Sequence, residues 1–493
     1  MNNMIMVPFI LPFFTALTQI AIPQRHKKWK HFLGLLSLLV LIGIEFYLLS
    51  QVWDGKILVS QMSNWPAPYG IVLLIDRLTA IMLLLTSITG FSALLYNLSD
   101  KESEHPLFQA LYQFLIVGLN GAFLTADLFN LFVCYELMLI SSYALLTLGN
   151  KRSQLGSGFH YISLNLLNST LFLFALALLY GMMGTLNMAD LSFKISRLPS
   201  DQMAWVQILS MVLLIVFAFK AALVPIFFWL PDTYPAPSFA TATLFAGIMT
   251  KVGVYSILRV FTLVFGGGQS YAAKWILPLA GFTMLVGVLG AICQMNIRRL
   301  LSFHIISQVG YMVMGIGFFT PLGIAGGISY IIHHIMVKSS LFLCGGLTRK
   351  LSGSEDLRQM GGLMKYPFFT GLFFIAGLSL AGLPPFSGFF SKFLVMKAGF
   401  DAKEYGIVAV SIIAGILTLF SMMKIFTMAF WGENEKPIKK IKKPLLIATF
   451  ILVSFSLTLS IFSETIFNLV KDAGEQVLNP DPYIKAVLTY KRL

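Results

Sequence analysis

The sequence is poor in charge. Charged residues make up 11% of its 493 residues, whereas hydrophobic residues make up 57%. A soluble domain is about 25% charged, so this chain lacks the polar side chains that a water-facing surface needs. Its mean hydropathy of +0.81 indicates a protein that faces lipid. The net charge of +14 would suggest a nucleic-acid partner in a soluble protein, but here most basic residues lie in short loops between apolar stretches, so we expect no nucleic-acid partner.

Cysteine is also scarce. The chain has Cys134, Cys293 and Cys344, each in or at the edge of an apolar stretch and none in a CxxC spacing. We interpret all three as small buried residues, and we expect no metal site and no cofactor. The amino terminus has no basic segment and no small-residue cleavage site, so we expect a retained first helix rather than a signal peptide.

Long apolar stretches dominate the chain instead. A helix needs roughly 20 mostly apolar residues to cross a bilayer, and no soluble domain separates the stretches that qualify. We predict an all-α membrane protein of about fourteen transmembrane helices, with a short polar tail from Lys471. The predicted spans are 4–23, 32–52, 70–97, 106–125, 127–148, 159–182, 204–228, 238–262, 275–294, 301–319, 323–347, 367–395, 406–430 and 445–467.

The loops between these spans differ in basic residues. Lysine and arginine concentrate in every second loop and are sparse in the loops between them. Cytoplasmic loops carry the excess of lysine and arginine, so both termini are predicted to lie outside a bacterial cell membrane that the chain crosses many times. The basic loops contain residues 25–30, Lys101, 151–152, 298–299, 349–365 and 436–443.

Some charges within the spans have simple explanations. A charged side chain at the bilayer centre costs about 2.5–3.5 kcal/mol on insertion scales. Arg77 directly follows Asp76 early in its span, which favours a pair at the interface. Arg259 and Lys424 lie near span ends and could extend to the interface. Glu45 is isolated in the second span, where a protonated carboxyl facing lipid, a contact with a partner protein and a functional role are all open.

Four lysines are harder to explain in this way. Each is flanked on both sides by at least a turn of apolar residues, so we expect each to face the bundle interior or water. A buried amine holds its proton less firmly than an exposed one, and a proton relay requires such exchange. The four are Lys220, Lys251, Lys338 and Lys392.

Prolines interrupt two of the helices that carry these lysines. Pro225 follows Lys220, and the segment Gly-Leu-Pro-Pro-Phe-Ser-Gly at 382–388 precedes Lys392. Proline removes a helix hydrogen bond, and interrupted backbone at membrane depth is tolerated only inside protein or along a cavity. Such breaks in corresponding positions of two halves are typical of transport proteins with inverted repeats.

An acid and two histidines extend the series of buried polar groups. Glu136 lies deep in the fifth span and needs a partner, for which Lys220 is the natural candidate, whereas Asp127 lies nearer the interface and could be structural. His334 and Lys338 are four residues apart and share one helix face, which suits proton transfer. His333 points elsewhere and His304 sits near a span start, so both rank lower.

These residues lie in motifs that resemble a known family. The segment 127–138, Asp-Leu-Phe-Asn-Leu-Phe-Val-Cys-Tyr-Glu-Leu-Met, is similar to the glutamate-bearing fifth helix of the complex I/Mrp antiporter-like family, and so is the run from Phe219 to Tyr255. The resemblance covers nearly the whole chain. It implies two inverted five-helix repeats, each containing a discontinuous helix. The implied division is 1–105 for the first three helices, 106–266 for the first repeat, 267–431 for the second repeat, and 432–493 for a final helix and short tail.

The resemblance also implies roles for the buried groups. Glu136 and Lys220 would be the ion pair of the first half-channel, and Lys251 the central connecting lysine. His334 and Lys338 would form the middle of the second half, and Lys392 its terminal lysine.

Two departures bear on the branch of the family. Complex I relatives usually carry a histidine before the Trp-Leu-Pro and an Ala-His-x-Glu-Ala-Pro after it, whereas this chain has Phe228 before and Asp-Thr-Tyr-Pro-Ala-Pro at 232–237 after. It also lacks the long carboxy-terminal lateral helix of the largest members. Both departures favour the branch formed by the D subunits of the multisubunit Mrp Na⁺/H⁺ antiporters.

That branch implies a transporter subunit rather than an enzyme, moving protons beside other antiporter subunits in a hetero-oligomeric complex that exchanges Na⁺ for H⁺. The alternative is a proton-pumping membrane subunit of a respiratory complex I or a membrane-bound hydrogenase. A self-sufficient carrier of organic solutes predicts polar groups around one central site, which the charges strung along several helices do not match. A purely structural scaffold leaves the buried lysines unexplained.

Overall fold

The computed structural model describes residues 2–99, 105–432 and 440–488. Within these residues, twelve helices are long and apolar enough to cross a membrane, and two more apolar helices are shorter, Phe108–Leu124 and Pro367–Ala381. The prediction of an all-α membrane protein with about fourteen spans is confirmed. Lys101, Lys436 and Lys439, which entered the orientation prediction, lie outside the described residues.

The helices follow one another with short connections. The membrane helices are α1 (Val7–Ala21), α2 (Lys27–Val52), α3 (Arg77–Asn97), α4 (Phe108–Leu124), α5 (Leu128–Thr147), α6 (Arg152–Met183), α8 (Ser200–Ala221), α10 (Phe239–Leu244) joined to α11 (Thr250–Leu263) by the π-helical turn Phe245–Met249, α12 (Ala273–Cys293), α13 (Ile297–Gly317), α14 (Pro321–Ser352), α15 (Pro367–Ala381) with α16 (Ser387–Asp401), α17 (Tyr405–Ile425) and α18 (Lys443–Ile461). The remaining helices are α7 (Met188–Ile195), α9 (Trp229–Thr233), α19 (Ser463–Leu478) and α20 (Pro480–Leu488).

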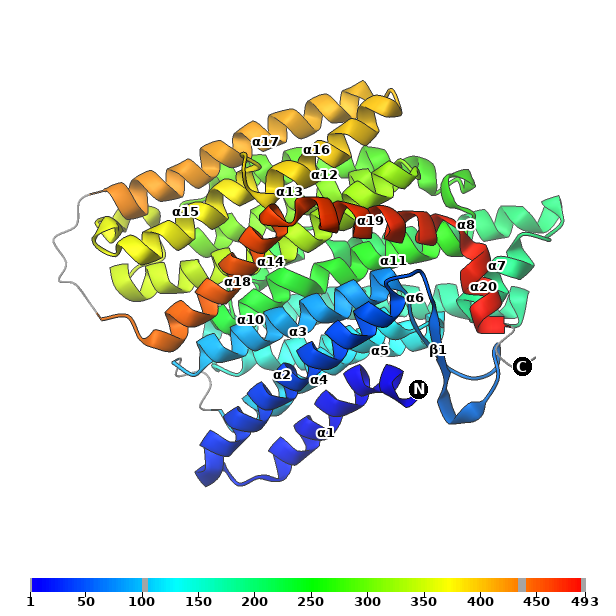
Figure 1. Cartoon of the computed structure of the whole chain (residues 1–493), viewed down its shortest axis with the longest axis horizontal. Helices are drawn as coiled ribbons and strands as arrows, with labels where there is room; N and C mark the ends of the chain where they lie inside the picture. Colours follow the sequence, from blue (N-terminus) through cyan, green and yellow to red (C-terminus); the bar gives the residue numbers. More distant parts are fainter. Residues whose placement is uncertain (1, 100–104, 433–439, 489–493) are drawn as a thin grey trace.

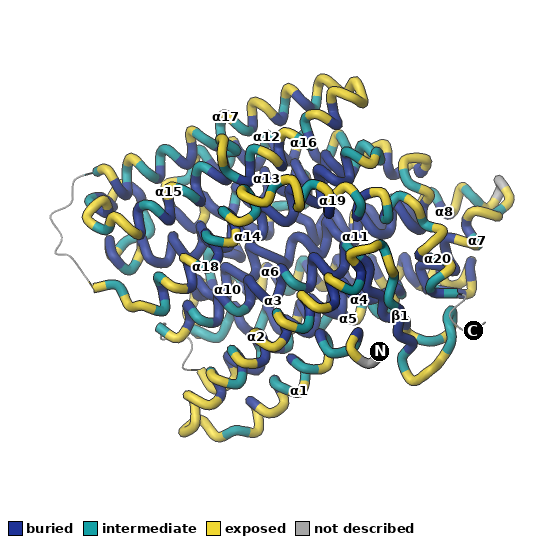
Figure 2. The backbone as a smooth tube through the Cα atoms, in the orientation of Figure 1, coloured by how far each residue is buried: buried dark blue, intermediate teal, exposed yellow. Residues whose placement is uncertain are grey.

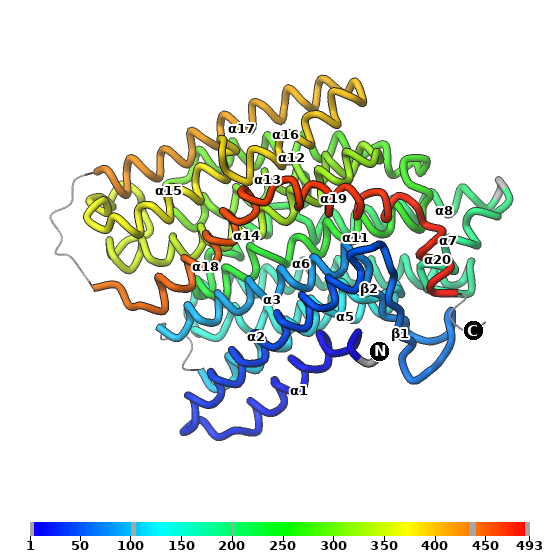
Figure 3. The backbone as a smooth tube through the Cα atoms, viewed as in Figure 1, coloured from blue at the N-terminus to red at the C-terminus, as the bar shows by residue number. Residues whose placement is uncertain are grey.

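The membrane helices run side by side along one direction. Helices α1 and α2 lie at one edge of the bundle and α17 lies at the opposite edge (Figure 3). The two ends of the chain emerge at the same end of the bundle (Figure 1). An even number of crossings requires this arrangement, so it agrees with the predicted span count.

Burial is greatest in the middle of the bundle. The most apolar windows of Phe239–Leu263 and Pro321–Ser352 are completely buried, whereas less than half of each window is buried in α1, α2, α12 and α17. In Figure 2 the exposed residues accordingly lie mostly along the outer helices, and the residues of the inner helices are mostly buried. Outer helices show apolar side chains to lipid, so the central helices α11 and α14 are where polar groups can be kept from lipid.

Two helices are broken, as the prolines predict. The first break follows α8 and the second separates α15 from α16, and each is capped in the same way. Ala222 and Gly382 take left-handed conformations with φ of 59° and 88°. The next amides, of Leu223 and Leu383, bond back to carbonyls five residues earlier at 2.9 and 3.2 Å. The chain reads Ala-Ala-Leu-Val-Pro at 221–225 and Ala-Gly-Leu-Pro-Pro at 381–385, which fits two related repeats; the repeat boundaries stay a prediction.

The third predicted span began too early. Residues 70–76 do not start the helix, because β1 (Leu58–Gln61) and β2 (Val72–Ile75) pair there as an antiparallel hairpin. The helix starts only after Asp76, whose carboxylate accepts from the Thr79 amide at 2.9 Å as an N-cap. A short apolar run such as Val-Leu-Leu-Ile cannot be assigned to helix or strand by its apolarity alone.

The carboxy-terminal segment is helical, which the prediction of a short polar tail missed. Helix α19 packs on α14 and α11, and it buries Val470 and Ala473. Its polar face is also tied down: Asp472 pairs with Arg77 at 3.2 Å, and the Gln476 amide donates to the Gly55 carbonyl at 3.0 Å. The polar residues that suggested a solvated tail therefore form one face of a packed helix.

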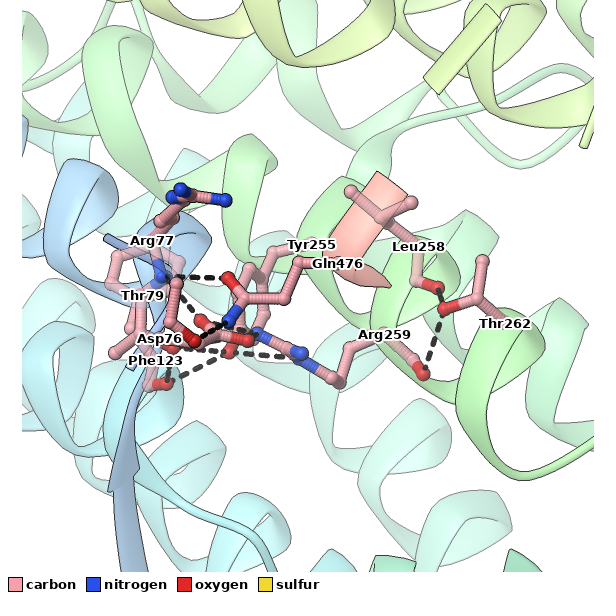
Figure 4. Close-up of polar contacts among 10 residues, drawn as sticks. Asp76, Arg77, Thr79, Phe123, Tyr255, Leu258, Arg259, Thr262 and Gln476 are labelled. Carbon is pink, nitrogen blue, oxygen red and sulfur yellow. Dashed lines mark hydrogen bonds and ion pairs between the residues drawn. The ribbon is translucent and has the colours of Figure 1, made fainter. Parts of the chain in front are cut away.

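Asp76 pairs with Arg259, not with Arg77 as the sequence suggested. The Arg259 guanidinium on α11 lies 2.7 Å from the Asp76 carboxylate, and the two side chains are 4% and 1% exposed (Figure 4). Tyr255 also accepts from Arg259 at 3.4 Å and donates to the Phe123 carbonyl of α4 at 2.8 Å. Arg259 therefore does not extend to the interface. It joins α3, α4 and α11 inside the bundle.

Removing one partner of this buried pair should destabilise the protein strongly. Asp76→Asn leaves the Arg259 charge buried without its counter-ion, which costs about 3–5 kcal/mol in comparable cases. We expect a clearly lower melting temperature for the purified protein in detergent. Asp472→Asn is the matched control, because Asp472 is 48% exposed and such surface pairs contribute about 0–1 kcal/mol. Equal shifts for the two variants would contradict the assignment.

Candidate functional site

Glu136 and Lys220 are each joined by a hydrogen bond to the same face of α6. The Lys220 ammonium on α8 donates to the Asn165 side chain at 3.0 Å, and the Ser169 hydroxyl donates to Glu136 on α5. Asn165 and Ser169 are four residues apart on α6, so they lie on the same face. Among the described residues no direct salt bridge joins Glu136 to Lys220, but the two charges are near enough to attract one another. The predicted pair is thus held together through two neutral side chains.

Lys220 is otherwise enclosed by aromatic and apolar side chains. It is 6% exposed, and its ammonium lies 5.3 Å from the centre of the Tyr135 ring. An aromatic face attracts a cation, and more so where water is excluded. Sequence reasoning singled out neither Asn165 nor Tyr135. A signal was present, because a polar Asn165 in an apolar helix requires a partner.

Lys251 lies at an irregular turn of its helix. Its ammonium is completely buried and donates to the Ala246 carbonyl at 2.6 Å. Ala246 belongs to the π-helical turn Phe245–Met249, which precedes α11. Turns of this kind disturb the regular pairing of backbone groups and often occur at functional sites.

His334 and Lys338 lie together in the middle of α14. Both are completely buried, and neither the imidazole nor the ammonium has a hydrogen-bond partner among the described residues. Lys251 is close enough for its charge to act on both of them. The structure therefore brings Lys251, His334 and Lys338 to one place in the interior, from two helices that are distant in sequence.

His304 is more central than its place near a span start suggested. It lies in the first half of α13, is completely buried, and shares a hydrogen bond of 2.9 Å between its Nε2 and the Ser421 hydroxyl of α17. Lys338, Lys392 and Lys424 all act on it electrostatically. His304 is thus near enough to both Lys338 on α14 and Lys392 on α16 to interact with them electrostatically.

Lys392 sits directly beneath the break between α15 and α16. Its ammonium donates to the Ala381 carbonyl, the last residue of α15, at 2.7 Å. The centre of the Tyr311 ring lies 5.0 Å away. Lys392 is 5% exposed, so the backbone carbonyl that the break leaves free is its main polar contact.

The remaining charges in the spans have other surroundings. Glu45 is completely buried, so the interpretation that its carboxyl faces lipid is wrong. Asp127 caps α5 by accepting from the Asn130 amide at 2.9 Å, which agrees with a structural role. Lys424 is half-buried and donates to the Ile292 and Gln294 carbonyls at 2.6 and 2.8 Å. Of the cysteines, Cys134 and Cys344 are buried as expected, but Cys293 is exposed at the end of α12.

We refer to Lys220, Lys251, Lys338 and Lys392 as the lysine file. Its members lie on α8, α11, α14 and α16, and all are at most 6% exposed. Histidines lie beside the last two members, and an acid lies at the Lys220 end. This arrangement can hold protons on successive amines within a bundle that shows apolar side chains to lipid.

Comparison with known proteins agrees with this architecture. The family model described as NADH:quinone oxidoreductase/Mrp antiporter, transmembrane, matches residues 125–418. A protein of Alkalihalophilus pseudofirmus, named as the D subunit of a Na⁺/H⁺ antiporter, is 44% identical over 495 residues, covering 99% of this chain and 100% of that protein.

Solved structures show the same fold. A chain of the Mrp complex from Dietzia sp. DQ12-45-1b has a TM-score of 0.93 and 30% identity, covering 99% of this chain and 100% of that one. A chain of the membrane-bound sulfane sulfur reductase, an archaeal respiratory membrane complex, has a TM-score of 0.89 and 26% identity, covering 98% and 99%. The chain belongs to the NADH:quinone oxidoreductase/Mrp antiporter family, in the branch of the Na⁺/H⁺ antiporter D subunits.

Proposed function

We propose that the chain carries protons across the membrane as one subunit of a multisubunit Na⁺/H⁺ antiporter. The observation that carries the proposal is the lysine file, four amines buried at membrane depth on neighbouring helices. A charge at that depth costs several kcal/mol, so charged residues there are rare and mark ion or proton pathways. The 44% identical relative, named as a Na⁺/H⁺ antiporter D subunit, supports antiport as the process that these amines serve. The other antiporter subunits would be its partners in the membrane.

In the proposed mechanism, a proton passes from one amine to the next through water. Glu136 stabilises the charged form of Lys220, and a change in that interaction releases the proton toward Lys251. Lys251, His334 and Lys338 then share it in the middle of the bundle. His304 interacts electrostatically with both Lys338 and Lys392, so it offers an imidazole for the last transfer. The chain needs no chemistry of its own for this, so we propose a transport subunit rather than an enzyme.

The likeness to a respiratory membrane complex keeps proton pumping in a redox-driven assembly as the alternative. In such a complex the lysine file would carry protons in the same way. Co-purification distinguishes the two, because small antiporter subunits favour the first function, whereas subunits that oxidise NADH or hydrogen favour the second.

Lys220→Ala should abolish Na⁺/H⁺ exchange while the complex still assembles, because the first amine of the file is lost and a small residue replaces it. Exchange is measured as Na⁺-dependent proton flux in everted vesicles, and assembly by co-purification of the other subunits. Lys274→Ala is the control, since Lys274 is exposed and lies outside the file. Full flux in the Lys220→Ala complex would refute the proposed function.

Asn165→Leu tests how Lys220 is held. The variant removes the acceptor of the Lys220 ammonium, and a hydrogen bond to a charged group is worth about 1.5–3 kcal/mol. We expect exchange to fall about tenfold or more in the same vesicles. Asn168→Leu is the matched control on α6, because Asn168 donates to the Val216 carbonyl at 3.3 Å and does not bind the lysine. Equal losses in both variants would mean that Asn165 acts only through packing.

We also propose that both termini lie outside the cell, from the bias of basic residues among the loops. Lys28→Cys at the start of α2 and Lys56→Cys in the loop after α2 place single exposed thiols near opposite ends of this helix, because both side chains are exposed. The exposed Cys293 is replaced by serine in both variants. A membrane-impermeant thiol reagent added to intact cells should modify Lys56→Cys only. Modification of Lys28→Cys alone would reverse the orientation.

A further inference from the structure

Glu45 is a buried acid to which the proposed function gives no role. It lies on α2, an outer helix of the bundle, and its side chain is completely buried although that of the next residue, Phe46, is 65% exposed. The other three acids of the predicted spans, Asp76, Asp127 and Glu136, each accept a hydrogen bond from a described residue. Glu45 therefore needs an explanation of its own.

The carboxyl group of Glu45 has no polar partner. Neither of its oxygens forms a hydrogen bond with a described residue, and among those residues no charged side chain acts on it electrostatically. Ser87 on α3 places its hydroxyl nearby without the geometry of a hydrogen bond. A carboxylate ion without a hydrogen bond or a counter-ion is very costly away from water. The neutral acid, which holds a proton, is therefore the form that this site favours.

Hydroxyls of α3 lead from Glu45 toward the centre of the bundle. Helix α3 packs on α2, and it also packs on α10 and α14. Ser87 and Thr89 are two residues apart, about 200° around the helix axis, so Ser87 faces Glu45 and Thr89 faces away from it. Thr86 lies between them on the circumference, about 100° from Ser87 and about 60° from Thr89. All three side chains are completely buried.

Thr89 lies beside the two central lysines of the file. Its Cγ2 is 3.1 Å from the position that a Cβ of Gly247 would take, and the Ser339 hydroxyl lies against the same position. Gly247 belongs to the π-helical turn that supplies the acceptor of Lys251. Ser339 directly follows Lys338 on α14. The series of hydroxyls that begins at Glu45 therefore ends next to both lysines.

Most of these hydroxyls are available to bind water. Those of Ser87, Thr89 and Ser339 have no hydrogen-bond partner among the described residues. The Thr86 hydroxyl donates to the Met82 carbonyl of its own helix at 2.8 Å, and its oxygen can still accept. Buried polar groups without a protein partner are commonly satisfied by buried water. Because a hydroxyl both donates and accepts, hydroxyls and water together can pass a proton along.

The lysines at the end of this series lack an acid. Lys251, His334 and Lys338 act on one another electrostatically, and no acid among the described residues acts on any of the three. A proton taken up there adds a positive charge to an apolar interior, which is costly. An acid that gives its own proton to the same place becomes negative, and two opposite charges attract strongly in such surroundings.

We propose that Glu45 is a proton-holding site on a side branch of the lysine file, and that it exchanges its proton with Lys338 through water bound by the α3 hydroxyls. The neutral acid gives its proton to a water molecule, and the last water of the series gives a proton to the neutral Lys338 amine. The products are a carboxylate and an ammonium, so the interior gains no net charge. The return transfer restores both neutral groups. The inference rests on the proposed function for its use in transport, but the proton on Glu45 can be observed without transport.

Infrared difference spectra of the purified complex test whether Glu45 holds a proton. The carbonyl stretching band of a protonated carboxyl is distinct from the bands of amides and carboxylates, and it shifts when deuterium replaces the proton. We expect Glu45→Gln to remove such a band, and Asp472→Asn, at an acid that is 48% exposed, to remove none. If Glu45→Gln removes no band, Glu45 holds no proton and the proposal is wrong.

Thr89→Val tests the path between Glu45 and the central lysines. Valine has nearly the shape of threonine but no hydroxyl, so deuterium from the buffer should reach Glu45 about tenfold more slowly, as expected for the loss of one hydrogen bond. Thr449→Val on α18 is the matched control, because Thr449 is also buried and its hydroxyl donates to the Leu445 carbonyl of its own helix at 2.9 Å. Equal deuterium uptake in the two variants would exclude the path along α3.

Glu45→Gln should also lower Na⁺/H⁺ exchange in everted vesicles about tenfold or more, because glutamine keeps the size of the side chain but cannot release a proton. Glu45→Asp should restore part of the exchange. Glu45→Leu separates this role from packing. Because it replaces an unpaired polar group by an apolar one, its complex should melt no lower than the unaltered complex and still lack exchange. Lower melting with full exchange would mean that Glu45 is only structural.

The outcomes also separate this inference from the proposed function. Full flux in Lys220→Ala, together with a Glu45 proton that exchanges for deuterium, would refute the proposed function and keep the proton-holding site. An inactive Lys220→Ala, together with full exchange in Glu45→Gln, would refute the side branch alone.

Discussion

The interior of this protein depends on giving each buried ammonium an oxygen acceptor where bulk water is absent. In a regular helix every interior carbonyl is already bonded to an amide four residues on. Free acceptors arise only where a helix ends or changes its winding. Lys251 uses the Ala246 carbonyl in a π-helical turn, Lys392 uses the Ala381 carbonyl at the end of α15, and Lys424 uses the Ile292 carbonyl near the end of α12. Three irregular helix segments thus each supply a backbone acceptor to one lysine ammonium.

Lys338 departs from this rule. Its ammonium has no hydrogen-bond partner among the described residues, and its electrostatic neighbours are Lys251, His334 and His304. A proton can leave or reach such an amine without breaking a protein hydrogen bond. The members on either side, Lys251 and Lys392, are each fixed to a carbonyl. Within the file, the Lys338 amine, which has no hydrogen bond among the described residues, thus lies between two amines that are each bonded to a backbone carbonyl.

The sequence was informative where a residue conflicted with its own neighbours. A lysine within an apolar helix, or two prolines at membrane depth, is costly whatever the tertiary structure, so the buried lysines and the two breaks could be predicted. Contacts between segments that are distant in the sequence could not be predicted. Asp76 and Arg259 are 183 residues apart, and the adjacent Arg77 appeared the simpler partner. The sequence predicts a short polar tail from Lys471, whereas α19 packs its apolar face on α14. A short segment does not show in its own residues what it will pack against. His304 ranks lower in the sequence because it lies near a predicted span start, and its partner Ser421 lies on another helix.

The two broken helices share their backbone but not the position of their lysine. The segments at 221–225 and 381–385 have equivalent caps and left-handed residues, yet Lys220 precedes its break and Lys392 follows its own. A lysine before the break cannot reach the carbonyl that the break frees, since that carbonyl points along the helix axis toward the following residues. Lys220 consequently depends on a side chain of α6, Asn165, whereas Lys392 depends on backbone. The acceptor at one end of the file can be altered by substitution or by a movement of α6, and the acceptor at the other end is fixed by the fold. The two ends of the lysine file therefore differ, because Lys220 has a side-chain acceptor that can change and Lys392 has a backbone acceptor that is fixed. Two identical repeats would not differ in this way.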